Sequence, residues 1–91
     1  MMVRNMKNEI LKKITDIINH LKDEDFNFTR VNSNSTFTYE FGLDSMDLLT
    51  LIVEVENFFE IMISDIDLDI SKINNIDFFV SKIENELKKG D

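Results

Sequence analysis

The sequence predicts an all-α fold, a small four-helix bundle with three longer helices and one short helix. Apolar residues recur every three or four positions in three separate segments, which is the spacing of amphipathic helices. No proline interrupts these segments, and no alternating valine-rich run indicates a strand. The chain has 91 residues without an internal repeat or a linker, so we expect one small domain spanning residues 1–91.

The first helix is predicted near the N-terminus, where lysine, glutamate, aspartate and asparagine separate the apolar positions. These positions are Met6, Ile10, Leu11, Ile14, Ile17, Ile18 and Leu21. From residue 22 to residue 40 the periodicity stops, and Asp, Asn, Ser and Thr dominate, which favours turns. We therefore expect a long ordered loop between helices one and two. Its apolar side chains should hold it against the bundle: Phe26, Phe28, Val31, Phe37 and Phe41.

The second helix is predicted from about Ser45 to Phe59, with two apolar flanks. The broader flank should face the core and consists of Leu48, Leu51, Ile52, Val55 and Phe59. The other flank is left for partners and consists of Met46, Leu49, Val53, Glu56 and Asn57.

Two further helices are predicted after residue 63. Ser64 or Asp65 should cap a short one that carries Ile66, Leu68 and Ile70. The last helix should open near Asn74 or Asn75. It should bury Ile76, Phe79, Val80, Ile83 and Leu87, with Lys82, Lys88 and Lys89 toward its negative end and Gly90 past that end.

The composition excludes several function classes. Eighteen acidic and ten basic residues give a net charge of −8, which argues against nucleic acid or an anionic membrane as partner and favours proteins with basic docking patches. Without cysteine the chain has no disulfides and no thiolate of its own, so any thiol chemistry must come from a cofactor. No segment resembles a membrane span or a secretory signal, so we expect a cytoplasmic protein.

Neither catalysis nor metal binding is predicted. His20 is the single histidine, so it has no histidine or cysteine with which to share a metal or build a nucleophile–base pair. The carboxylates of Asp65, Asp67 and Asp69 alternate like those that open an EF-hand loop. However, the sixth position, which needs glycine, is Ile70, and the twelfth, which needs glutamate, is Ile76. We expect neither an enzyme nor a specific metal site.

The hydroxyl of Ser45 is the strongest candidate for a functional group. Gly42 can make a turn and Asp44 can cap the second helix, which would leave the Ser45 hydroxyl at an exposed helix start. Aspartate and serine are the commonest caps, so these local features alone fit an ordinary helix start as well. A helix start does stabilise an attached anion, because its first N–H groups are unpaired. A phosphate ester is the natural anion to attach to a hydroxyl.

The stretch from Thr36 to Ile63 resembles the carrier domains of the acyl carrier protein family. That family has a leucine- or phenylalanine-glycine pair, one further residue, then Asp-Ser-Leu or Asp-Ser-Met, and here the run is Phe41-Gly42-Leu43-Asp44-Ser45-Met46. The resemblance implies that Ser45 carries 4'-phosphopantetheine through a phosphodiester and that its terminal thiol holds acyl groups as thioesters. It also implies that Asp44 helps the loading transferase to engage.

The same resemblance implies a set of partners. They are a phosphopantetheinyl transferase that uses coenzyme A and magnesium, and acyl-loading and acyl-processing enzymes with basic patches. We expect them to dock on the flank that Ser45 opens, formed by Met46, Asp47, Leu49, Val53 and Glu56. The carrier itself should be a monomer.

The residues of the second helix also bear on the pathway. Thr50 stands where general fatty-acid carriers tend to have glutamate, and Asn57 and Phe58 replace further acidic positions. This pattern favours a dedicated carrier in polyketide, nonribosomal peptide or other specialised assembly over the general fatty-acid carrier. The second helix also resembles the D-alanyl carriers of cell-wall modification. The alternative from another function class is an acidic helical adaptor that binds proteins without a prosthetic group.

Overall fold

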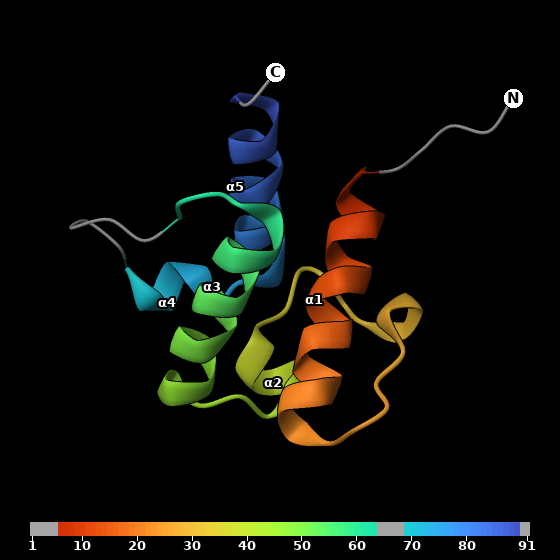
Figure 1. Cartoon of the computed structure of the whole chain (residues 1–91). Helices are drawn as coiled ribbons and strands as arrows, with labels where there is room; N and C mark the ends of the chain where they lie inside the picture. Colours follow the sequence, from red (N-terminus) through yellow and green to blue (C-terminus); the bar gives the residue numbers. More distant parts are fainter. Residues whose placement is uncertain (1–5, 64–68, 90–91) are drawn as a thin grey trace, which may run out of the picture.

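A computed structural model describes residues 6–63 and 69–89 (Figure 1). Three longer helices form the frame of the protein. They are α1 (Met6–Lys22), α3 (Ser45–Phe59) and α5 (Ile76–Lys89). Shorter helical segments connect them, namely η1 (Phe28–Arg30), α2 (Phe37–Phe41) and α4 (Ile70–Ile73). The described residues form helices and no strand, so the predicted all-α fold is confirmed.

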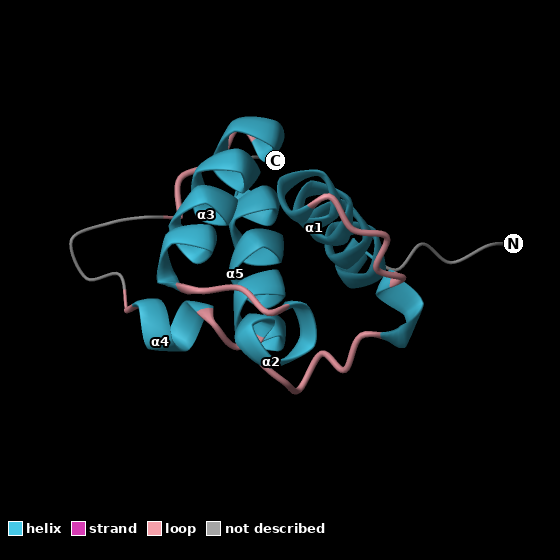
Figure 2. Cartoon of the chain, turned by 90° about the horizontal axis from the view of Figure 1, so that it is seen from below, coloured by secondary structure: helices cyan, strands magenta, loops and turns pink. Residues whose placement is uncertain are grey.

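The core lies between α1, α3 and α5. Figure 2 looks along the bundle and shows α5 between α1 and α3, with α2 crossing one end. Each long helix turns its predicted apolar flank inward, and the buried side chains include Ile10, Ile14, Ile18, Leu48, Leu51, Ile52, Val55, Ile76, Phe79, Val80 and Ile83. Met6 and Leu21, at the ends of α1, are exposed instead.

The segment predicted as a plain loop contains two short helical turns, which corrects that part of the prediction. Asn27 caps η1 by accepting the N–H of Thr29, and Thr36 caps α2 by accepting the N–H of Tyr39. The same polar side chains that favour turns therefore also start helices. A five-residue helix such as α2 gives too few apolar positions for a periodic pattern to stand out.

The loop aromatics do hold this segment against the bundle, as predicted. Phe37 and Phe41 are buried, four residues apart on α2. The Phe37 and Phe79 rings meet edge-on with their centroids 5.5 Å apart, and the Phe41 and Phe26 rings meet edge-on with their centroids 5.0 Å apart. Phe26, Phe28 and Val31 are partly buried against the same core. Such aromatic pairs add specific geometry to the burial of apolar area.

Backbone hydrogen bonds tie the start of α2 to the junction between α4 and α5. The Phe37 N–H donates to the carbonyl of Asn74 at 2.8 Å, and the Ile76 N–H donates to the carbonyl of Ser35 at 3.1 Å. These two bonds place α2 beside α4, although the two elements are far apart in the sequence.

The last two helices begin at side-chain caps. Asp69 caps α4 by accepting the N–H of Ser71 at 3.0 Å, and Asn75 accepts the N–H of Phe78 at 2.8 Å in the first turn of α5. The predicted start of the last helix is confirmed. The proposed caps Ser64 and Asp65 lie outside the described residues, as do Ile66, Leu68 and Gly90.

Candidate functional site

The chain turns sharply between α2 and α3, and Ser45 follows that turn. Gly42 ends α2 with a φ of 71°, in the left-handed region that glycine enters at little cost. The Leu43 side chain is buried and anchors the turn to the core. Ser45 is then the first residue of α3 and is exposed.

A reciprocal pair of hydrogen bonds fixes the first turn of α3. The Asp47 N–H donates to the Asp44 carboxylate at 2.8 Å, and the Asp44 N–H donates to the Asp47 carboxylate at 3.2 Å. This is a capping box, with Asp44 as the predicted cap. Ser45 and Met46 lie between the two members of the box, so the box holds Ser45 at a defined and exposed place.

Asp47 also binds a cation from another helix. The Lys22 ammonium at the end of α1 lies 3.2 Å from the Asp47 carboxylate. The N–H of Asp44, and after it the hydrogen bond from Lys22, hold the pKa of the Asp47 carboxyl below its ordinary value. Asp47 therefore stays ionised and ties α1 to α3 where the candidate site begins.

Ser45 borders an open hollow of about 570 Å³ between α2, α3 and α4. The hollow is lined by Thr38, Gly42, Leu43, Asp44, Ser45, Leu48, Ile70, Ser71 and Asn74. The Ser45 hydroxyl makes no hydrogen bond within the described part of the chain, so no internal partner competes for it. The residues therefore fit a phosphopantetheine ester: an accessible hydroxyl, a helix start that favours the phosphodiester anion, and adjoining space.

The predicted docking residues divide into two groups. Met46, Leu49 and Val53 are exposed on the outer flank of α3, with Met46 at 71% of its full exposure. The two acidic ones already have internal partners, because Asp47 binds Lys22 and the half-buried Glu56 accepts the N–H of Ile63 at 2.8 Å. The apolar strip is thus open to a partner, whereas Glu56 also holds the chain after α3.

The fold adds residues around Ser45 that the sequence does not predict. Only the fold brings four further side chains to the site, namely Lys22 from α1, Thr38 from α2, Ser71 from α4 and Asn74, which follows α4. The signal for Asn74 was weak, because an asparagine between two helical segments is already explained as a cap.

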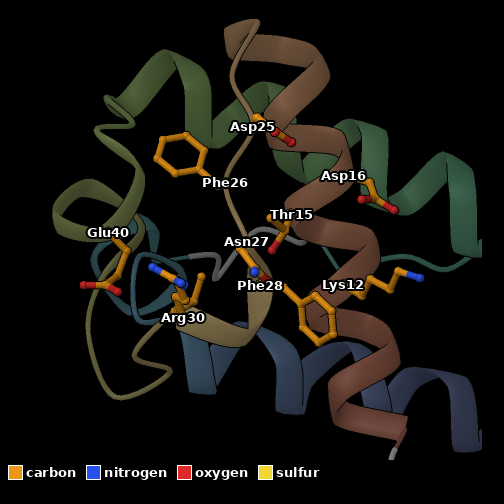
Figure 3. A pocket seen from close by; sticks show the side chains of 10 residues that line it. Lys12, Thr15, Asp16, Asp25, Phe26, Asn27, Phe28, Arg30 and Glu40 are labelled. Carbon is orange, nitrogen blue, oxygen red and sulfur yellow. The ribbon is translucent and has the colours of Figure 1, made fainter.

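Other hollows contain none of the predicted site residues. Figure 3 shows one of about 660 Å³, with Lys12 and Asp16 on α1 at one side and Arg30 and Glu40 at the other. It mixes charges of both signs. His20 is exposed and lies in a groove between α1 and α3.

The acidic run that resembles an EF-hand lies partly outside the described residues, since Asp65 and Asp67 belong to the undescribed stretch. Asp69 is described and uses its carboxylate to cap α4. Within the described ranges, no cluster of three or more metal-ligating side chains is present, and no helix is both long and apolar enough to cross a membrane.

Comparison with known proteins agrees with this geometry. The family model for the phosphopantetheine attachment site matches residues 9–76. An acyl carrier protein of Cyanidium caldarium is 37% identical over 84 residues, which cover 88% of this chain and 93% of the relative. An acyl carrier protein of Buchnera aphidicola is 32% identical over 87 residues, which cover 96% and 100%. One of Chlorobium phaeobacteroides is 36% identical over 76 residues, covering 81% and 95%.

Members of this family are carriers rather than enzymes, and their cofactor is covalently attached 4'-phosphopantetheine. The capped helix start, the all-α fold and the matches over most of the chain lead to one conclusion. The chain belongs to the acyl carrier protein family.

Proposed function

We propose that Ser45 is the attachment residue for 4'-phosphopantetheine and that the chain carries acyl intermediates as thioesters between enzymes. The observation that carries this proposal is the exposure of Ser45. It is the first residue of a capped 15-residue helix, and it borders an open hollow. Ser45 also lies inside the region that the family model matches. When attached, the cofactor supplies the thiol that this cysteine-free chain lacks.

The residues around Ser45 have distinct duties in this proposal. The N–H groups in the first turn of α3 stabilise the phosphodiester anion, because they carry the positive end of the helix dipole. Asp44 fixes that turn and helps the transferase to engage Ser45. The buried Leu43 prevents the turn from moving with the attached group.

The outer flank of α3 is proposed to dock partner enzymes through Met46, Asp47, Leu49, Val53 and Glu56. An exposed apolar strip flanked by carboxylates suits a partner with a shallow apolar surface inside a basic rim. Steering by the net charge of −8 would give fast encounter and easy release, which a carrier that visits several enzymes needs.

We propose a dedicated set of partners, as in polyketide, nonribosomal peptide or D-alanyl transfer pathways, rather than the general fatty-acid system. The support is the far end of α3, where Asn57 and Phe58 are exposed. The Phe58 ring is 54% exposed and the Lys13 ammonium lies 4.0 Å from its centroid. This end of the helix is therefore less acidic and more aromatic than a purely electrostatic docking surface. The adaptor alternative does not require an exposed serine, so the site favours the carrier.

Peptide mapping of the protein tests the attachment residue. After coexpression with a phosphopantetheinyl transferase, the phosphopantetheine mass should lie on the peptide that contains Ser45. Neutral hydroxylamine should release any acyl group from the wild type, because it cleaves thioesters. A modification found on Ser33, Ser35 or Ser71 instead would refute the assignment.

A further inference from the structure

The side chain of Asn74 has a fixed orientation at the end of α4. Its Oδ1 accepts two hydrogen bonds from Thr38, one from the backbone N–H at 3.1 Å and one from the hydroxyl at 3.2 Å. A backbone N–H can only donate, so the oxygen of the amide must face Thr38. The amide nitrogen of Asn74 must therefore point away from Thr38.

The hollow beside Ser45 offers both hydrogen-bond donors and acceptors. Asn74, Thr38 and Ser71 all line it. The Thr38 hydroxyl donates its proton to Asn74, and the Ser71 hydroxyl donates its proton to Asp69 at 2.7 Å, so both hydroxyl oxygens still have lone pairs to offer. The Asn74 nitrogen, in contrast, has two N–H groups and no acceptor among the described residues.

This pattern is complementary to a secondary amide, a group that the pantetheine arm contains. A secondary amide has a carbonyl oxygen that accepts and an N–H that donates, which are the complements of the Asn74 nitrogen and the two hydroxyl oxygens. A purely apolar chain would leave these polar groups without partners, which costs free energy where water is displaced. Leu48 is buried and Ile70 is half-buried at the wall, so they can pack against methylene groups on either side of the amide.

We propose that the hollow docks an amide group of the pantetheine arm, with Asn74 Nδ2 donating to its carbonyl oxygen and a Thr38 or Ser71 hydroxyl accepting its N–H. This inference rests on the proposed attachment at Ser45, since pantetheine contains two secondary amides and would start at the edge of the same hollow. Asn74 is then a positioning residue for the arm. One or two hydrogen bonds in an open hollow are weak enough that the arm can leave when a partner enzyme binds.

Two matched variants separate this role from a general effect of charge or folding. Asn74→Asp keeps an oxygen to accept both hydrogen bonds from Thr38 but has no N–H to donate. Asn75→Asp adds the same charge one residue later, in a side chain that accepts the N–H of Phe78 and is not among those lining the hollow. Each variant should therefore keep its structural bonds, and one of them should lose the donor to the arm.

The test is nuclear magnetic resonance of the protein before and after loading with isotope-labelled pantetheine, with loading confirmed by mass. In the wild type the side-chain amide signals of Asn74 should shift on loading, and the amides of the arm should be less mobile than in free pantetheine. In Asn74→Asp the ratio of docked to free arm should fall roughly two- to tenfold, as expected for one lost neutral hydrogen bond. Asn75→Asp should behave as the wild type.

Loaded protein in which the Asn74 signals do not shift would overturn this inference, and so would equal arm mobility in the wild type and Asn74→Asp. An equal loss in Asn75→Asp would also overturn it, because the effect would then be one of charge. A wild-type chain that never gains the cofactor mass would instead refute the attachment at Ser45, so the two failures are distinguishable.

Discussion

The Lys22 ammonium binds the Asp47 carboxylate at 3.2 Å, and the same carboxylate accepts the N–H of Asp44. The last turn of α1 is thereby tied to the first turn of α3, two residues after Ser45. A basic group of a partner that approaches Asp47 therefore meets a carboxylate that already has a cationic neighbour.

The lowered pKa of Asp47 predicts a pH-dependent stability. Its pKa is held below the unfolded value of about 3.9, so the ionised carboxylate stabilises the fold fully above that pH. This contribution to the unfolding free energy is lost as the pH falls through the lower pKa of the folded state. Urea unfolding of wild type and Asp47→Asn between about pH 6 and pH 3 should show a stability difference that narrows on acidification. A difference that stays constant over this range would contradict the prediction.

Replacing the cap Asp44 should lower the unfolding free energy more than replacing Ser45, the proposed attachment residue. Asp44→Ala removes the acceptor for the Asp47 N–H and should lower the unfolding free energy by about 1 kcal/mol. Ser45→Ala removes an exposed hydroxyl without a described partner, so its cost should be within about 0.5 kcal/mol. Chemical denaturation of both variants measures this, and the opposite ranking would mean that Asp44 does not hold the start of α3.

Gly42→Ala should be destabilising because of the backbone alone. A Cβ at Gly42 would meet nothing within 4 Å, but the φ of 71° is strained for any residue with a side chain. The net cost should be about 1 kcal/mol in urea unfolding, since alanine also reduces the entropy of the unfolded chain. A neutral or stabilising result would show that the turn before Ser45 can adopt another backbone conformation.

Docking on α3 should combine a salt-sensitive and a salt-insensitive contribution. Glu54 is exposed, so Glu54→Lys should slow association with the transferase, and added salt should reduce the defect. Val53→Asp should also weaken binding, but its defect should persist at high salt because it removes an apolar contact. Binding kinetics at low and high salt measure both. Glu54 is a cleaner probe than Glu56, whose carboxylate binds the Ile63 N–H.

Glu86→Lys supplies the matched control for this experiment. It makes the same change of charge near the end of α5, and that end of the helix lies opposite the start of α3 (Figure 1). Its ion pair with Lys89 is on the surface, so the loss should affect stability little. If Glu86→Lys impaired binding as much as Glu54→Lys, net charge rather than the surface of α3 would govern docking.

The long helices could be predicted from the sequence because their apolar residues follow a helical period. The start of α3 was also predictable, since Gly42, Asp44 and Asp47 each have a local function in turning the chain and capping the helix. The short helix α2 was not, because its start depends on the bond from Phe37 to the distant Asn74. Local pattern and tertiary contact therefore explain different parts of the fold.

The candidate site divides in the same way. Ser45 and Asp44 could be proposed from one contiguous run, and the exposed strip on α3 from its spacing. The Lys22 contact and the orientation of Asn74 are products of tertiary packing, and nothing in the local sequence distinguishes them from ordinary surface residues.

We propose that Ser45 carries the cofactor, and intact mass spectrometry can measure this. The wild type and Ser45→Ala are each expressed with a phosphopantetheinyl transferase, and circular dichroism verifies that both are folded. The wild type should gain the mass of one phosphopantetheine group, and Ser45→Ala should gain none. A wild type that stays unmodified, or a Ser45→Ala variant that still gains this mass, would contradict the claim.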